Sequence, residues 1–203
     1  MKKYLIYLIF ASLTFGCVDT ELKLPFLGNP QTINGRQVYP VVKPFSFVNQ
    51  DSITVSNKDF RNRIYVADFM FLSCPTICPK MTVEMKKVYD IFQVNPQVMF
   101  LSHTIDPKND TVEKLSRYAK NLGAKTPKWH FVTGDRDSIY TIAKDSYYAT
   151  AYSDKAAPGG YVHSGGLLLI DKNQHIRGVY DGTDPNETQR LIADLNILLK
   201  EKQ

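Results

Sequence analysis

Apolar residues occur along this chain in short runs and in helical spacings that follow one another in a regular order. The run Ile64–Phe71 is β-branched, aromatic and almost uncharged, which predicts a central strand buried on both faces. After Pro79, which suits the first turn of a helix, apolar residues recur at helical spacing. The predicted apolar face consists of Met81, Met85, Val88, Ile91 and Phe92, and the predicted solvent face of Glu84, Lys86, Lys87 and Asp90.

The same pattern of apolar and polar positions continues on both sides of this strand and helix. Before the central strand, it predicts short strands at Phe45–Val48 and Ile53–Val55 and a helical turn at Asn57–Phe60. After the helix, it predicts strands at Val98–Ile105 and Trp129–Val132, a helix at Val112–Leu122 that is capped by Asp110-Thr111 and ended by Gly123, and a helix at Asp135–Lys144. The chain should end with a hairpin of Gly166–Ile170 and His175–Tyr180 and a helix at Pro185–Lys200, which has Thr188, Leu191, Ile192, Leu195 and Leu198 on one face. Alternating strands and helices predict an α/β fold with a central mixed sheet flanked by helices.

The N-terminus has the pattern of a secretory signal. A basic start at Met1–Lys3 precedes the apolar run Tyr4–Phe15 and then Gly16-Cys17. Ending on Gly-Cys, it resembles a bacterial lipoprotein signal in which Cys17 receives lipid, although Thr14 and Phe15 depart from the usual residues. An uncleaved anchor is the alternative, but the run is short for a span of about 20 residues. Both interpretations tether the protein outside the cytoplasm.

The composition of the rest of the chain indicates an N-terminal arm followed by one domain. Residues 18–40 are polar and broken by proline and glycine, so we expect a linker or N-terminal arm, followed by a single domain at 41–203. With 203 residues and 43% apolar content, the chain can bury one core. Loss of Lys2 and Lys3 with the signal leaves 23 basic against 20 acidic residues, which gives no reason to expect a nucleic-acid partner.

Two cysteines mark the turn between the central strand and its helix. Cys74 and Cys78 stand where free backbone N–H groups and the helix dipole favour a thiolate, so we expect lowered pKa values, above all for Cys78. On a helical turn their Cα atoms would lie about 6 Å apart, which suits either a disulfide or two sulfur ligands for one metal ion.

The segment Ala67–Thr82 resembles the copper-binding motif of the Sco/SenC family, thioredoxin-like proteins that help to assemble the copper site of cytochrome c oxidase. The likeness extends from about Phe45 to the C-terminus. It implies a thioredoxin-like fold and one copper ion, Cu(I) or Cu(II), per chain. His163, in the glycine-rich loop Gly159–Gly166, would complete the site, although Val162 stands where family members often have an acidic residue.

The other histidines and two aspartates have different expected places. We expect His130 to be packed in a strand and His175 to be exposed, whereas His103 ends a core strand at the edge where α/β active sites gather and is a candidate neighbour of the site. Asp68 should be buried with a raised pKa, either as a proton shuttle beneath the dithiol or as a structural group. Asp106 matches a family motif beside the copper loop, or serves as a turn carboxylate.

Three functions fit these residues. The leading hypothesis is a copper metallochaperone that serves the copper-binding subunit of cytochrome c oxidase or its assembly factors, anchored by lipid at the periplasmic or other extracytoplasmic membrane face. The alternative is a thiol–disulfide oxidoreductase in which Cys74 attacks and Cys78 resolves, so the sequence leaves open whether the protein is an enzyme. A peroxiredoxin-like activity fits less well. Zinc accepts the same ligands as copper, and disulfide formation would remove both sulfurs.

Overall fold

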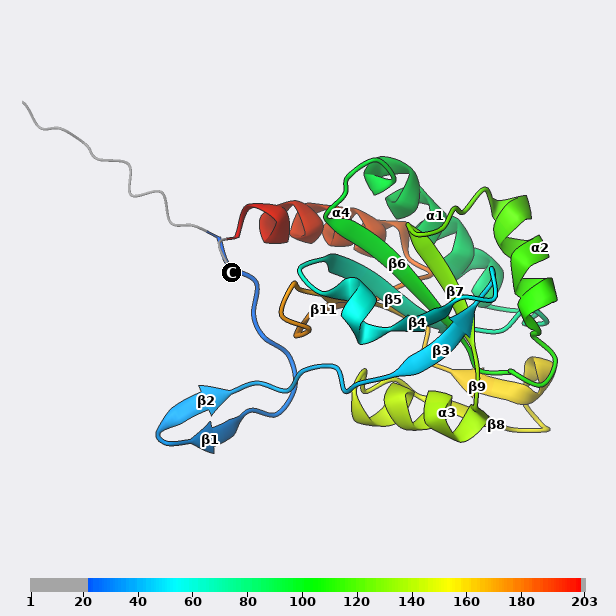
Figure 1. Ribbon diagram of the computed structural model, residues 1–203, viewed down its shortest axis with the longest axis horizontal. Helices are drawn as coiled ribbons and strands as arrows, with labels where there is room; N and C mark the ends of the chain where they lie inside the picture. The colour runs from blue at the N-terminus through cyan, green and yellow to red at the C-terminus, as the bar shows by residue number, and fades with distance from the viewer. Residues whose placement is uncertain (1–21, 202–203) are drawn as a thin grey trace, which may run out of the picture.

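The structure, a computed structural model, describes residues 22–201, so the predicted signal at 1–17 and the lipidation of Cys17 lie outside the described residues. The elements are β1 (Gln31–Ile33), β2 (Arg36–Val38), β3 (Ser46–Asn49), β4 (Thr54–Ser56), η1 (Asn57–Phe60), β5 (Ile64–Met70), α1 (Cys78–Phe92), β6 (Val98–Thr104), α2 (Val112–Leu122), β7 (Trp129–Thr133), α3 (Arg136–Asp145), β8 (Ala151–Ser153), η2 (Pro158–Gly160), β9 (Tyr161–His163), β10 (Gly166–Ile170), β11 (Ile176–Asp181) and α4 (Pro185–Lys200) (Figure 1).

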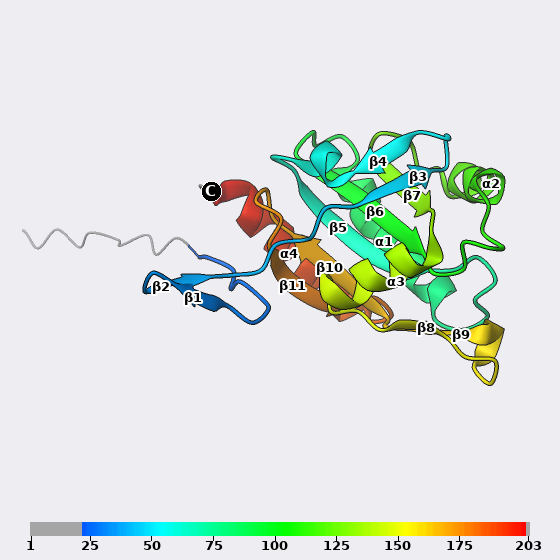
Figure 2. The ribbon, with the colours of Figure 1, turned by 60° about the horizontal axis from the view of Figure 1, so that its bottom comes forward.

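The main sheet has seven strands in the order β11-β10-β5-β6-β7-β3-β4. β5, β6 and β7 run parallel, whereas β10, β11, β3 and β4 join by antiparallel pairs. Helices α1, α2 and α4 contribute to the core on one face and α3 to the core on the other, and Figure 2 shows α3 in front of the sheet with α1 behind it. This confirms the predicted mixed sheet flanked by helices.

β5, the strand predicted to be central, lies inside the sheet between β10 and β6, and all seven of its residues are buried. Side chains alternate along a strand, so Tyr65 and Phe69 join the core beneath α3 while Ile64 and Val66 join the core beneath α1 and α4. Because β5 and β6 are parallel, they end at the same edge of the sheet, and the chain leaves β5 there to enter α1. Sites in open α/β sheets form at such an edge.

The predicted faces of α1 are wrong at two positions. Glu84, expected in solvent, is buried and accepts a hydrogen bond from the Thr188 hydroxyl at 2.8 Å, and Ile91, expected in the core, is 54% exposed. The reason is that α4 packs against α1 and covers the side that carries Glu84. Lys87 forms an ion pair with the same carboxylate at 2.6 Å, so its charge is compensated.

The N-terminal arm contains a hairpin, β1–β2, that stands away from the main sheet (Figure 2). Before it, the backbone N–H of Leu27 donates to the carbonyl oxygen of Ile176 at 2.9 Å. Arg177 is fully buried and donates to the carbonyl oxygens of Leu24 and Pro25. These bonds dock the start of the arm on β11. Among the described residues, no helix is both long and apolar enough to span a bilayer.

Candidate metal centre

The cysteine loop connects β5 to α1 and holds two buried free thiols. Cys78 is the first residue of α1, and its backbone N–H donates to Sγ of Cys74 at 3.4 Å. The preceding N-cap residue, Ile77, makes no side-chain capping bond, so the sulfur of Cys74 accepts one of the free N–H groups at the helix start. The backbone N–H of Cys74 bonds in turn to the carbonyl oxygen of Phe71 at 3.2 Å, which fixes the loop against β5.

The two thiols have opposite electrostatic environments. Burial opposes ionisation of Cys74, but hydrogen bonds from the Cys78 thiol and from backbone groups of Thr76 and Cys78 outweigh it and lower its pKa. Burial raises the pKa of Cys78, and the hydrogen bond to Cys74 raises it further. The prediction of a lowered pKa is therefore confirmed for Cys74 and wrong for Cys78, because burial opposes ionisation of Cys78 and its own backbone N–H donates to its neighbour's sulfur.

His163 ends β9 and reaches the same loop from another part of the chain. Its Nε2 atom lies 3.1 Å from Sγ of Cys78, and its Nδ1 atom lies 3.1 Å from the carbonyl oxygen of Ser164. A carbonyl only accepts, so the ring proton is on Nδ1 and the lone pair of Nε2 faces the sulfur. Burial lowers the pKa of His163, which favours the neutral ring. The carbonyl of Ser164 orients the ring although Val162 is not acidic.

Among residues 22–201, Cys74, Cys78 and His163 form a group that could hold one metal ion, with ligand atoms all within 4.8 Å of one another. The family model described as SCO1/SenC matches residues 34–200. The chain belongs to this family. A curated relative, the SCO1 protein homolog of Bacillus subtilis, is 29% identical over 156 residues, covering 76% of this chain and 80% of that protein.

Solved structures agree with this membership. A SCO1/SenC family lipoprotein from Bacillus anthracis superposes with a TM-score of 0.72 at 29% identity, covering 79% of this chain and 95% of that one. BsSco, described as a member of the Sco family of cytochrome c oxidase assembly proteins with a disulfide switch, gives 0.70 at 26% identity, covering 88% and 100%. ScoI from Bradyrhizobium japonicum, solved with copper bound, shares the fold at 21% identity with a TM-score of 0.65, covering 78% and 99%. The fold is thus the thioredoxin-like fold of Sco proteins.

The remaining three histidines lie outside this group. His103 is fully buried with its ring stacked on Phe69, and neither ring nitrogen has a hydrogen-bond partner, so the expectation that it borders the site is wrong. The register explains this, because His103 pairs with Phe69 and faces the α3 side of the sheet. His130 is packed as predicted and accepts from Asn49 at 3.0 Å. His175 is only 21% exposed, and Phe26 of the arm covers it.

Asp68 is buried in β5, as predicted. Burial raises its pKa to about 6, and one of its carboxylate oxygens has no hydrogen-bond partner. Its charge contributes to the raised pKa of Cys78, which places it near that thiol. Asp68 is therefore available as an acid or base beneath the cysteine loop, and its part in any reaction stays a prediction.

Asp106 is buried after β6 and lies beside the hairpin that carries His163. Its carboxylate accepts from the Asn109 amide at 3.1 and 2.9 Å and from the Tyr161 hydroxyl at 2.7 Å. It is not among the candidate ligands. The turn role anticipated from the sequence is present, together with a link to β9 that the sequence did not indicate.

Sequence reasoning missed how Asp110, Phe71 and Tyr161 shape the centre. Asp110, expected as part of a helix cap, accepts from the backbone N–H of Leu72 at 3.1 Å and so ties the cysteine loop to the loop after β6. Phe71 packs its ring against both Tyr161 and His163. For these roles the sequence offered one signal, which is that Phe71 stands at the end of the apolar run.

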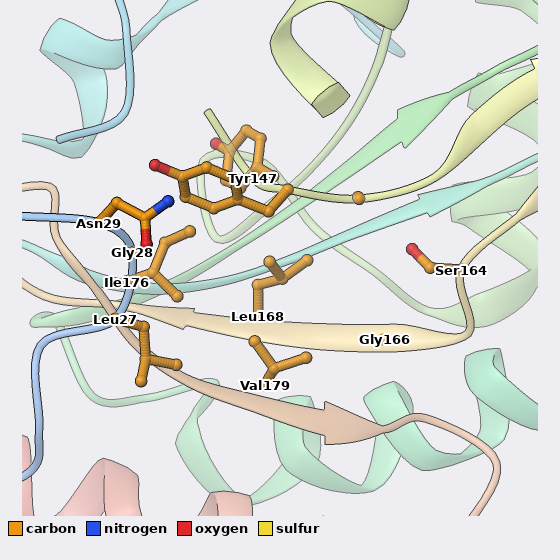
Figure 3. Close-up of a pocket in the computed structure, with 11 residues that line it drawn as sticks. Leu27, Gly28, Asn29, Tyr147, Ser164, Gly166, Leu168, Ile176 and Val179 are labelled. Carbon is orange, nitrogen blue, oxygen red and sulfur yellow. The ribbon is translucent and has the colours of Figure 1, made fainter. Parts of the chain in front are cut away.

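A pocket of about 380 Å³ lies between the arm and the outer strands of the sheet (Figure 3). Its walls come from the arm at Leu27, from the segment after α3 at Tyr147, and from β10 and β11 at Leu168 and Val179. Ser164, the residue whose carbonyl orients the imidazole, lies at its edge.

Proposed function

We propose that this Sco protein binds one copper ion through Cys74, Cys78 and His163 and passes it to the copper-binding subunit of cytochrome c oxidase or to a factor that assembles it. The observation that carries the proposal is the convergence of two sulfurs and one imidazole nitrogen within 4.8 Å. These donors come from the start of α1, the loop before it and a separate hairpin.

The donor chemistry suits copper. Thiolates are soft ligands that stabilise Cu(I), and imidazole binds both oxidation states. The tautomer of His163 leaves the Nε2 lone pair free for a metal. Cys74 has a lowered pKa, whereas Cys78 has a raised one and would release its proton on binding, so binding should become tighter as the pH rises. Zinc would accept the same donors, and the family favours copper.

A second candidate function is thiol–disulfide exchange with an exported protein. The observation that favours it is the asymmetry of the thiols, since Cys74 ionises more readily and Cys78 stays protonated until Cys74 has reacted. Cys74 would attack the client disulfide and release one client sulfur as a thiolate. Cys78, after giving its proton to the released client thiolate, would then attack the Cys74 sulfur of the mixed disulfide and expel the second client sulfur as a thiolate, leaving the Cys74–Cys78 disulfide and a reduced client. The disulfide switch identified in BsSco supports a redox-active pair.

The protein would work at a membrane surface outside the cytoplasm, held by lipid on Cys17. The sequence pattern at 1–17 and the lipoprotein description of the Bacillus anthracis relative support this anchor. An inhibitor of lipoprotein signal processing should leave the chain uncleaved and therefore heavier. An unchanged mass would contradict lipidation.

Metal titration of the chain from residue 18 onward, reduced and kept anaerobic, tests the proposal. We expect one copper per chain and an intense thiolate-to-Cu(II) charge-transfer band. Cys74→Ala or Cys78→Ala should abolish the band, and His163→Ala should weaken Cu(II) binding about 100-fold or more and alter the EPR spectrum. His175→Ala, a histidine outside the ligand group, is the matched control.

The two candidate functions predict different results. If His163→Ala binds copper like the unchanged protein, the three-ligand site is wrong. Weak, non-stoichiometric copper binding by the unchanged protein, combined with rapid reduction of a disulfide client by the His163→Ala variant, would instead favour thiol–disulfide exchange.

A further inference from the structure

The strand that carries His163 is not part of the main sheet. β8 and β9 form a separate two-stranded sheet with Ala151 opposite His163 and Ser153 opposite Tyr161, and we call the segment 151–163 the histidine hairpin. An isolated hairpin of this size is marginally stable in water. Contacts between its side chains and the rest of the domain must therefore fix where it lies, and with it the imidazole.

One of these contacts joins a phenol to a carboxylate. The Tyr161 hydroxyl donates to Oδ1 of Asp106 at 2.7 Å. Asp106 is 1% exposed, and the Asn109 amide donates hydrogen bonds to both of its carboxylate oxygens. The carboxylate that accepts from Tyr161 is therefore held in place independently of Tyr161. Hydrogen bonds to an ionised partner are shorter and about twice as strong as neutral ones. The contacts of Ser153 with α3 are instead exposed to solvent.

A ring contact connects this bond to the metal centre. Phe71 lies with its ring centroid 5.2 Å from that of Tyr161 and 5.8 Å from that of His163, nearly perpendicular to the imidazole. Phe71 also belongs to the cysteine loop, because its carbonyl oxygen accepts from the N–H of Cys74. Phe71 thus packs against both Tyr161 and His163. A shift of Tyr161 would move the imidazole relative to Sγ of Cys78.

We infer that Tyr161 is a positioning residue: its hydrogen bond to Asp106 latches the histidine hairpin onto the loop that follows β6 and sets the 3.1 Å approach of His163 to Cys78. The latch operates in the metal-free protein. Any effect of the latch on copper binding rests on the function proposed above, because the latch can influence copper only through the position of His163. Asp106 is the fixed half of the latch, since it belongs to the loop that follows β6 and Tyr161 to the hairpin.

Tyr161→Phe tests the latch with little change in shape, since it removes only the hydroxyl. In the reduced metal-free chain we expect amide hydrogen exchange across 151–163 and alkylation of Cys78, which is 5% exposed, to accelerate about tenfold to a hundredfold. Exchange in β5 should not change, which separates hairpin release from loss of global stability. Tyr152→Phe, on the opposite strand of the hairpin and 47% exposed, is the matched control and should change neither rate by more than about twofold.

A double-mutant cycle tests the partner. Asp106→Ala should release the hairpin as Tyr161→Phe does, and Tyr161→Phe should add nothing in the Asp106→Ala background. If Tyr161→Phe accelerates exchange by the same factor in the Asp106→Ala background as in the unchanged protein, the pairing of Tyr161 with Asp106 is wrong. If Tyr161→Phe leaves exchange and alkylation at the level of Tyr152→Phe, the latch is wrong whatever the copper result.

Copper titration of the same variants separates this inference from the proposed function. With both correct, Tyr161→Phe weakens copper binding by the factor by which it lowers the fraction of chains with a closed hairpin, and the EPR spectrum broadens toward that of His163→Ala to the same extent. A hairpin that is mostly open in Tyr161→Phe, with copper affinity and EPR spectrum unchanged, would support the latch and overturn His163 as a ligand.

Discussion

The Nε2 atom of His163 lies 3.1 Å from the Sγ atom of Cys78, although 85 residues separate the two in the sequence. Cys78 is fixed by the start of α1, and His163 by a hairpin that shares no strand with the main sheet. The distance between the two atoms therefore depends on how the hairpin packs on the cysteine loop. Four predictions follow from this packing and from the buried groups around it.

Cys74 should be alkylated before Cys78 in the reduced, metal-free protein. Its pKa is lowered, so its thiolate fraction rises at a lower pH than that of an ordinary cysteine, whereas the raised pKa of Cys78 keeps that thiol protonated into the alkaline range. Iodoacetamide labelling from pH 5 to 10, read by peptide mass, measures both. Modification of Cys78 first, or a Cys74 profile matching that of the denatured chain, would contradict the assignment.

Gly159→Ala should disturb the hairpin more than Gly160→Ala. Both glycines have a positive φ, +77° and +84°, so both substitutions share the same backbone cost, about 1 kcal/mol. Only at position 159 would the new Cβ meet another side chain, 2.8 Å from Cε2 of Phe71, whereas position 160 is open. Hydrogen exchange of residues 151–163 should therefore accelerate more in Gly159→Ala. Equal rates would show that Phe71 yields without moving the hairpin.

His103→Leu should flatten the loss of stability on mild acidification. Burial lowers the pKa of His103 to about 3, below the unfolded value of about 6.5, so folding requires the neutral ring. Its contribution is fully present above pH 6.5 and is lost as the pH falls from there toward 3. Between pH 6.5 and 5 the loss is about 2 kcal/mol. Denaturant unfolding at the two pH values measures it. A loss of the same size in His103→Leu would exclude His103 as the cause.

Arg177→Met should destabilise the domain by about 3 to 5 kcal/mol, because it leaves the buried carboxylates of Asp171 and Glu201 without their cation. It also removes the donor to the carbonyl oxygens of Leu24 and Pro25, so the start of the arm should become sensitive to protease. Arg190→Met, at a half-exposed ion pair, is the control, with an expected cost below 1 kcal/mol. A similar midpoint for the two variants in urea would contradict this.

The local pattern predicted most elements because strand and helix periods are written into neighbouring residues. β5, α1 and α2 lie where their apolar spacing and capping residues place them, with Thr111 and Gly123 as the observed caps of α2. The pattern was wrong for Glu84 because spacing alone does not tell which other helix will cover a face. It was also wrong for Cys78, because the pKa of a thiol depends on its burial and on the sulfur to which nearby N–H groups point.

The sequence by itself determined the alternation of strands and helices, the strand-to-helix turn that holds Cys74 and Cys78, and a resemblance that named His163. These properties depend on residues a few positions apart. The tertiary structure decided that the imidazole reaches Cys78, that the Ser164 carbonyl fixes its tautomer, that His103 lies in the core, and that Tyr161 meets Asp106. Each of these depends on the order of strands in the sheet, which brings segments far apart in the chain to one edge, and on side-chain packing that no local period encodes.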